Sequence, residues 1–185
     1  MKKTIQATAV LVSVFLSGAA SAAGSVPTFK GAGGNVEFTG EIVDSSCNVT
    51  STSKNLHVDL GHWAKSYFTS VGDETTKKPF SINVDNCPAS VTSVAVLFDG
   101  QKDKTDPTLL EVAAGSAGGT AATGVAIKLY NASNASQIQL GQLSEAVAPV
   151  SAKAQLDFLA DYRATTTTVT AGPANATATF LMVYN

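Results

Sequence analysis

Charged residues and histidine are scarce in this sequence, and their scarcity excludes several classes of protein. Only 14% of the 185 residues are charged and the net charge is −2, so the chain lacks the basic stripe of a nucleic-acid-binding protein. Its hydrophobic content of 44% excludes a disordered chain. The mean hydropathy of +0.15 is high for a protein in water, which indicates that a partner covers part of the apolar surface.

Catalytic and metal-binding patterns are also missing. The two histidines, His57 and His62, lie in one short stretch, and no serine stands in a G-x-S-x-G sequence. The parts of a hydrolase are therefore not assembled, and we expect no catalytic residue, no cofactor and no small-molecule substrate. His57, Asp59 and His62 could be interpreted as a metal cluster, but a surface loop is the favoured interpretation.

Two further groups have both a functional and a structural interpretation. Asp99, Asp103 and Asp106 faintly suggest a calcium loop, but the spacing lacks the later bidentate glutamate, which favours a solvated loop. The aromatic residues in the range 63–68 could form a platform for a sugar. A small satellite core under a long loop is the favoured interpretation.

The first residues have the form of a secretory signal peptide. Lys2 and Lys3 precede an apolar stretch, and Ala20-Ser21-Ala22 forms an A-x-A cleavage site. The apolar stretch is shorter than the roughly 18 residues of a spanning helix. We therefore predict a signal peptide over residues 1–22, with Ala23 as an alternative cleavage point, and export of the remaining chain as one domain.

The cysteines are only two, Cys47 and Cys87, and both lie in the predicted exported part. An oxidising compartment makes a disulfide the expected state of such a pair. It would close a loop of about 40 residues, which stabilises by roughly 4 kcal/mol on the chain-entropy model. A zinc site is excluded because neither cysteine has a CxxC partner or a nearby histidine.

Short runs of alternating apolar and polar residues predict an all-β fold. A period of two, interrupted by Gly, Asn, Asp and Pro, is typical of a β-sandwich. These runs cover residues 36–42, 56–60, 80–84, 94–98, 125–129, 138–140, 156–162 and 176–184. The best helical candidate, residues 143–156, contains Pro149, which breaks a helix interior.

The last run poses a problem of pairing. Residues 180–184 are apolar on both faces, as in an interior strand, and Asn185 follows directly. An interior strand needs a hydrogen-bonded neighbour on each side. One neighbour is expected to come from outside this domain, and residues 23–35 form a strand-length extension with few apolar side chains. The sequence thus predicts an open groove and a loose strand.

Four motifs, taken together and in their order along the chain, resemble those of the structural pilins of chaperone–usher fimbriae, particularly the type 1 major-subunit group. The motifs are residues 33–43 leading into Cys47, residues 80–84 ending at Cys87, residues 124–130 with 140–141, and residues 176–185 with the penultimate Tyr184. The resemblance implies an incomplete immunoglobulin-like sandwich over residues 36–185 that lacks its last strand. Donor-strand exchange with a neighbouring pilin would complete it.

The resemblance also implies partners and site residues. A periplasmic chaperone first lends a strand, and at the outer-membrane usher the extension of the next subunit replaces it, giving a surface fimbrium that supports adhesion. The expected donor residues are Val26, Phe29, Gly33 and Gly34, with Phe29 as the principal anchor. The expected groove and chaperone contacts are Phe180, Met182, Tyr184 and Asn185.

The position of the subunit in such a fibre has more than one interpretation. A rod subunit is favoured, and a minor or adapter pilin is the alternative. The sequence departs from the group at residues 57–63, which are unusually aromatic, and at Pro27 and Phe29. A secreted carbohydrate-binding sandwich is a further alternative, although such a module closes its own fold.

Overall fold

The structure of the protein is a computed structural model that describes residues 33–40 and 46–185. It consists of two units divided after Gly40. The predicted signal peptide, Val26 and Phe29 lie outside the described residues. Residues 33–40 form no strand, whereas residues 46–185 form two sheets, so the placement of the domain start at residue 36 stays a prediction.

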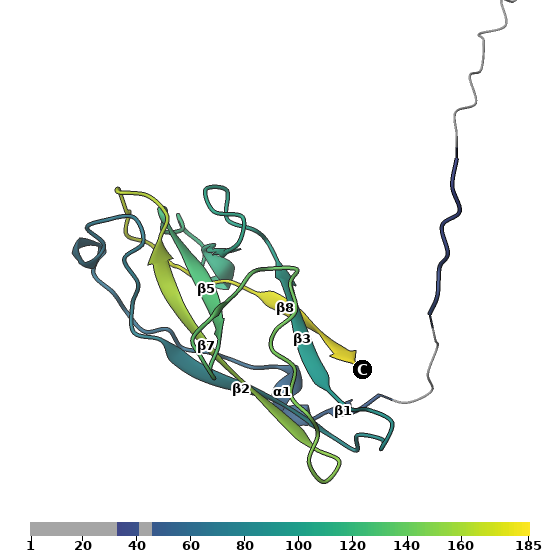
Figure 1. Ribbon diagram of the computed structural model, residues 1–185. Coiled ribbons are helices and arrows are strands. Elements are labelled where there is room, and N and C mark those ends of the chain that lie inside the picture. Colours follow the sequence, from purple (N-terminus) through teal and green to yellow (C-terminus); the bar gives the residue numbers. More distant parts are fainter. Residues whose placement is uncertain (1–32, 41–45) are drawn as a thin grey trace, which may run out of the picture. The chain divides into compact units, whose positions relative to one another are not determined.

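The larger sheet is antiparallel and contains most of the strands (Figure 1). Its order is β1 (Asn48–Val49), β2 (Lys78–Asp85), β7 (Ala154–Ala164), β5 (Val125–Asn131) and β4 (Leu110–Glu111), and β6 (Gln137–Ile138) also pairs with β5. The second sheet pairs β3 (Val94–Gly100) with β8 (Ala178–Tyr184). The described residues also form the short helix α1 (Ser51–Lys54) and two 3-10 turns, Lys65–Tyr67 and Gly115–Ala117.

The alternating runs form strands because one face of each is buried. In β7, Ala154, Leu156 and Phe158 are buried, while Gln155 and Asp157 between them are exposed. This is the period expected of a strand with one face on a core. The predicted strands at 80–84, 94–98, 125–129, 156–162 and 176–184 are confirmed as parts of β2, β3, β5, β7 and β8.

Three phenylalanines join the two sheets. Phe80 and Phe158 come from the larger sheet and Phe98 from β3, with ring centroids 5.0 Å apart for Phe98 and Phe158 and 6.1 Å apart for Phe80 and Phe98. These edge-to-face contacts are the favourable geometry for aromatic pairs. The core therefore lies between the sheets and extends along the inner face of β8.

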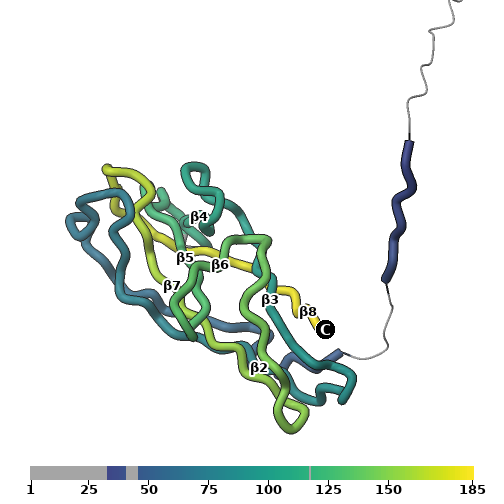
Figure 2. The backbone as a smooth tube through the Cα atoms, in the orientation of Figure 1, coloured from purple at the N-terminus to yellow at the C-terminus, as the bar shows by residue number. Residues whose placement is uncertain are grey.

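A segment between β6 and β7 covers the edge of β3 that faces away from β8 (Figure 2). The N–H groups of Gly141 and Ser144 donate to the carbonyls of Phe98 and Val96, each at 2.8 Å. Val94 and Val147 exchange two further bonds of 2.8 Å. β3 therefore has main-chain partners on both edges.

Two of the predicted strands are wrong in the part of the chain that the structure describes. Residues 36–40 and residues 56–60 form no strand and belong to no sheet. Alternation of apolar and polar residues reports which face of a segment is apolar, but it does not report whether a partner strand exists. Neither segment has such a partner within the described residues.

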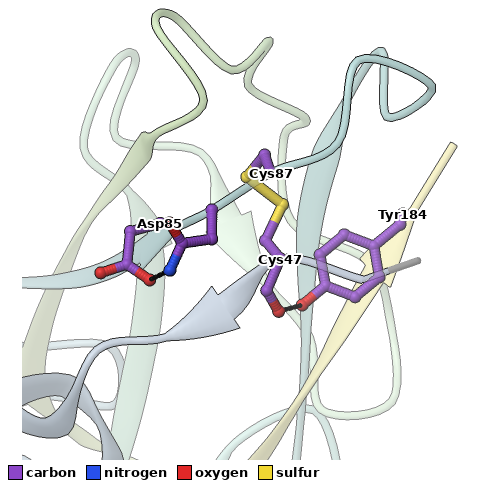
Figure 3. Close-up of a disulfide and its surroundings, with 5 residues drawn as sticks. Cys47, Asp85, Cys87 and Tyr184 are labelled. Atoms are coloured by element: carbon purple, nitrogen blue, oxygen red, sulfur yellow. Dashed lines mark hydrogen bonds between the residues drawn. A yellow bond between two sulfur atoms is a disulfide. The ribbon is translucent and has the colours of Figure 1, made fainter.

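The predicted disulfide is confirmed. Cys47 and Cys87 are bonded and nearly fully buried (Figure 3). They join the chain just before β1 to the chain just after β2, where Asn48 is paired with Asp85. The bond therefore fixes β1, a two-residue outer strand of the larger sheet, to its neighbour.

Removing the disulfide should lower stability without removing any chemical activity. The paired substitution of Cys47→Ser and Cys87→Ser frees a loop whose closure accounts for about 4 kcal/mol on the chain-entropy model. We expect a large fall in the yield of folded exported protein. Non-reducing mass spectrometry of the wild-type chain should show no free thiol, and two free thiols in folded protein would contradict the structure.

Candidate functional site

The free edge of β8 is the first part of the site. Along one edge β8 pairs with β3 in an unbroken register from Ala178 opposite Gly100 to Tyr184 opposite Val94. Among the described residues no strand pairs with its other edge. Unlike the central strands of the larger sheet, β8 contains no fully buried residue. Its main-chain groups on the free side therefore need a partner from elsewhere.

The two faces of β8 differ, which corrects one expectation from the sequence. Phe180, Met182 and Tyr184 share the inner face and pack against the core. Leu181, on the outer face, is 64% exposed. The prediction that both faces bury apolar surface is therefore wrong at Leu181, because none of the described residues forms a layer over the outer face of this sheet.

A groove with a volume of about 1240 Å³ lies beside the first residues of β8, Ala178 to Phe180, and the expected groove residues Met182 and Tyr184 do not line it. One wall of the groove is formed by residues 54–65, which we name the wall segment. The other wall is formed by residues 169–177 and the start of β8. The floor is almost wholly apolar. It consists of Phe80, Ile82, Phe98, Leu110, Val125, Ile127, Leu129, Ala160 and Tyr162.

The wall segment presents a second free edge to the groove. Val58 packs against the core and Leu60 is only 7% exposed, while His57 and Asp59, which alternate with them, are exposed. Within the described chain, the main-chain groups of residues 56–59 make no main-chain hydrogen bond. Both walls therefore carry unpaired main-chain groups, and a strand between them could bond on each side.

The C-terminal end of β8 is tied to the disulfide region. The Tyr184 hydroxyl donates to the Cys47 carbonyl at 3.0 Å (Figure 3), and burial raises the pKa of Tyr184. The main-chain oxygen of Asn185 accepts from the N–H groups of Thr92 and Ser93 at 2.6 and 3.1 Å. Tyr184 and Asn185 thus lie together at one end of β8, and the chaperone contact expected of them stays a prediction.

A second tyrosine, Tyr162, lies on the floor of the groove. Its hydroxyl donates to the Ala174 carbonyl at 2.8 Å, which fixes the segment that leads into β8. Burial raises the pKa of Tyr162, and the negative charge of Asp59 raises it further. Tyr162 therefore keeps its proton and its role as a donor at neutral pH.

Residues 33–40 carry apolar side chains into solvent. They form no helix or strand, and Val36 is 74% exposed and Phe38 is 90% exposed. Gly33 and Gly34 are exposed, with open space around both. Sequence reasoning missed Val36 and Phe38 as exposed apolar side chains, because it assigned their alternation to the first strand of the sandwich.

A family model described as "Fimbrial protein" matches residues 36–185. The chain belongs to the fimbrial protein family. It is 35% identical to the fimbrial subunit type 1 of Salmonella typhimurium over the full length of both chains. It is 38% identical to the long polar fimbria protein A of the same species, covering 100% of this chain and 97% of the relative.

Solved structures support the same fold. A type I fimbria protein of Burkholderia pseudomallei is 31% identical, with a TM-score of 0.57 over 77% of this chain and 91% of the other. The P pilus rod subunit matches with a TM-score of 0.62 over 75% of this chain and 99% of the other at 22% identity. The predicted immunoglobulin-like all-β class is confirmed. Like its relatives, this fimbrial subunit is a structural protein and not an enzyme.

The aspartate loop and the aromatic cluster singled out in the sequence each make contacts within their own part of the chain. Among the described residues no three His, Cys, Asp or Glu side chains are grouped as metal ligands. The carboxylates of Asp103 and Asp106 instead accept hydrogen bonds from main-chain N–H groups of their own loop. Trp63, Tyr67 and Phe68 pack on one another with centroids 5.0 and 5.5 Å apart. Within the described ranges, no helix is long and apolar enough to cross a membrane.

A cluster of ion pairs anchors the chain that follows the wall segment. The Glu74 carboxylate contacts Lys77 at 3.0 Å and Lys128 at 2.8 Å, and it also pairs with Arg163. Burial acts to raise the pKa of Glu74, but hydrogen bonds from these three cations outweigh it and lower the pKa from 4.5 to about 2. The neighbouring Thr75 N–H donates to the Tyr162 carbonyl at 3.0 Å.

A buried carboxylate lies beside this cluster. Asp161 is 0% exposed and accepts a hydrogen bond from the Tyr130 hydroxyl at 3.1 Å, and Lys77 lies 3.3 Å away. Burial raises the pKa of Asp161, and the Lys77 charge opposes this shift. The ammonium groups of Lys77 and Lys128 lie 4.5 and 4.8 Å from the centroid of the Tyr130 ring, a favourable cation–π arrangement.

Replacing Glu74 should make the subunit less stable and less sensitive to acid. Because the folded state lowers the pKa of Glu74, its contribution is present above about pH 4.5 and is lost as the pH falls towards 2. We expect Glu74→Gln to lower the free energy of unfolding by roughly 1–3 kcal/mol at pH 7, and by much less near pH 2.5. Urea unfolding at both pH values measures this.

The exposed pair of Lys104 and Glu111 supplies the control for that measurement. Its two charged atoms are 3.0 Å apart, but the Lys104 side chain is 85% exposed. Glu111→Gln should therefore change stability by less than about 1 kcal/mol. Equal losses from Glu74→Gln and Glu111→Gln at pH 7 would contradict the role given to the Glu74 cluster.

Proposed function

We propose that the groove along β8 receives an extended segment from another subunit, so that the chain polymerises head-to-tail into a fimbria on the cell surface. The observation that carries this proposal is the free edge of β8 above an apolar floor, in a groove of about 1240 Å³. Each buried main-chain group without a partner costs roughly 1–3 kcal/mol. An added strand would satisfy these groups and cover the floor in one step.

The donor that fits this groove is the N-terminal segment, with Val36 and Phe38 as its anchors. In an extended chain Gly34, Val36, Phe38 and Gly40 share one face, and both apolar side chains are exposed in the described segment. An aromatic side chain that is 90% exposed gains most from burial. Phe29, the anchor expected from the sequence, stays a prediction.

Assembly by this route gives an open filament. The donor segment and the groove are different surfaces of one chain, so the contact is head-to-tail and does not close on itself. The same groove would hold a strand from a periplasmic chaperone before assembly, with Tyr184 and Asn185 at the end of β8 as the contact, and the outer-membrane usher would exchange one strand for the other.

The rod is the favoured position of the subunit. The chain is 37% identical over 91% of its length to a probable major fimbrial subunit of Escherichia coli O157:H7, which supports an abundant subunit of the fibre. A minor adapter is the second candidate. A self-contained carbohydrate-binding module is disfavoured by the open groove, since such a module completes its own sandwich.

Filling the groove in cis should stabilise the subunit strongly. A copy of residues 26–42, fused after Asn185 through a flexible linker, contains both sets of candidate anchors. Because the copy binds only the folded state, we expect a soluble monomer that melts roughly 20 °C or more above the unfused chain. Differential scanning calorimetry and size-exclusion chromatography measure both properties. An unfused chain that is equally heat-stable and monomeric would contradict the proposal.

The anchor assignment has its own test in the native N-terminal segment. Phe38→Asp places a charge where an apolar side chain must be buried, so fibres should be absent or very short. Phe29→Asp is the matched variant and should leave fibre length much less affected. Electron microscopy of cells that express the complete assembly system measures fibre length. The reverse ranking of the two variants would restore Phe29 as the principal anchor.

A further inference from the structure

The aromatic cluster of Trp63, Tyr67 and Phe68 continues from the groove to the surface of the domain. Trp63 and Phe68 line the groove, and the Tyr67 ring packs on both, with centroids 5.0 and 5.5 Å apart. Tyr67 is nevertheless 46% exposed, and Val71, on the turn that follows, is 57% exposed. An apolar surface therefore extends from the groove into solvent.

The polar atoms of the aromatic cluster already have partners within the chain. The Trp63 indole N–H donates to the Leu60 carbonyl at 2.9 Å, and the Tyr67 hydroxyl donates to the Glu74 carbonyl at 3.1 Å. These bonds fix both rings. The surface that the cluster leaves to solvent is ring carbon, which an apolar partner can cover at no cost in lost hydrogen bonds.

The aromatic cluster and the disulfide lie at opposite ends of the larger sheet. After the cluster, the Gly72 N–H donates at 2.9 Å to the carbonyl of Ala164, the last residue of β7. At the disulfide, the Cys87 N–H donates at 3.0 Å to the carbonyl of Ala152, two residues before β7 begins. Because β7 runs along the sheet between these two contacts (Figure 1), the domain has an aromatic end and a disulfide end.

The disulfide end carries an exposed valine on a tight turn. Val150 and Lys153 exchange main-chain hydrogen bonds of 2.8 and 3.1 Å across Ser151 and Ala152. These two residues have φ angles of 51° and 60°, a left-handed conformation that residues other than glycine rarely adopt and that is concentrated at functional sites. The turn leaves Val150 75% exposed.

The length of the chain after the donor segment brings the disulfide end of one subunit close to its neighbour. With Val36 and Phe38 in the groove of the accepting subunit, the chain has only the seven residue steps from Gly40 to Cys47 in which to reach the donating domain. Seven steps span at most about 25 Å. The disulfide end of the donating subunit is therefore held near one end of the groove that its own segment fills.

The geometry of an open filament selects the aromatic end of the accepting subunit. A donor antiparallel to β8 ends beside the start of β8, where Ala174 is bonded to Tyr162 near the end of β7. A parallel donor ends beside Tyr184, which is bonded to Cys47 at the disulfide end. Since each subunit also donates from its own disulfide end, the parallel arrangement brings both neighbours to one end. A head-to-tail filament needs them at different ends.

We propose that Val150 of the donating subunit docks on the aromatic end of the subunit whose groove it fills, and covers Tyr67 and Val71 there. The partner is a second copy of this chain. The proposal rests on the proposed strand-acceptor function, with Val36 and Phe38 as anchors, and adds a side-chain contact between the same two copies. Burial of apolar surface drives the contact, and it fixes the orientation of two domains that are otherwise joined by the short connection alone.

Disulfide trapping in assembled fibres tests this contact. Val71→Cys and Val150→Cys, combined in one chain, place a thiol on each side of the joint at exposed positions, so folding should be unaffected. After mild oxidation and boiling in SDS without reductant, we expect fibres of this variant to give a ladder of covalent multimers that reduction converts to monomer. Because a disulfide requires Cα atoms within about 7 Å of each other, the ladder reports direct contact.

The matched control combines Val71→Cys with Leu143→Cys. Leu143 is 52% exposed, but it lies opposite Leu97 in the middle of β3, away from both ends. This pair, and each single variant, should give monomer under the same treatment. Fibres of normal length whose Val71→Cys, Val150→Cys chains form no more ladder than this control would show that the aromatic end has another occupant, and would overturn the inference. If the unsubstituted chain forms no fibres, the proposed function fails, and the inference fails with it.

Discussion

The unpaired edge of β8 is the constraint on which the rest of the structure depends. Phe180, Met182 and Tyr184 turn their side chains into the core, so this strand must stay in place, yet its main-chain groups have a partner on the β3 side alone among the described residues. A fold completed by its own chain would cover this edge. In this family member the apolar floor and the free edge instead form one surface that is suited to an added strand.

Two tyrosine hydroxyls fix the chain before β8 and at the end of β8. Tyr184 bonds to the carbonyl of Cys47, a residue of the disulfide, and Tyr162 bonds to the carbonyl of Ala174 just before β8. Behind the wall segment, the Glu74 cluster fixes the following chain to β5 and β7. These contacts fix the segments that border the groove to the two sheets.

Much of this fold was predictable from the sequence, and the exceptions share a cause. Strands such as β2 and β7 bury one face, and burial leaves a period-two pattern that the sequence displays. The same pattern at Val36 and Phe38 suggested a strand of the sandwich, because alternation cannot reveal which chain supplies the partner. The exposure of Leu181 and the convergence of Lys128 and Arg163 on Glu74 depend on which distant segments meet, and local pattern contains no such information.

Hydrogen–deuterium exchange of β8 tests the central claim most directly. If β8 lacks a neighbour in the free subunit, the amides that do not bond to β3 should exchange rapidly there. In assembled fibres, or with a donor strand fused in cis, the same amides should become protected while those bonded to β3 change little. Equal, strong protection of all β8 amides in the free subunit would show that the chain completes its own sandwich and would contradict this account.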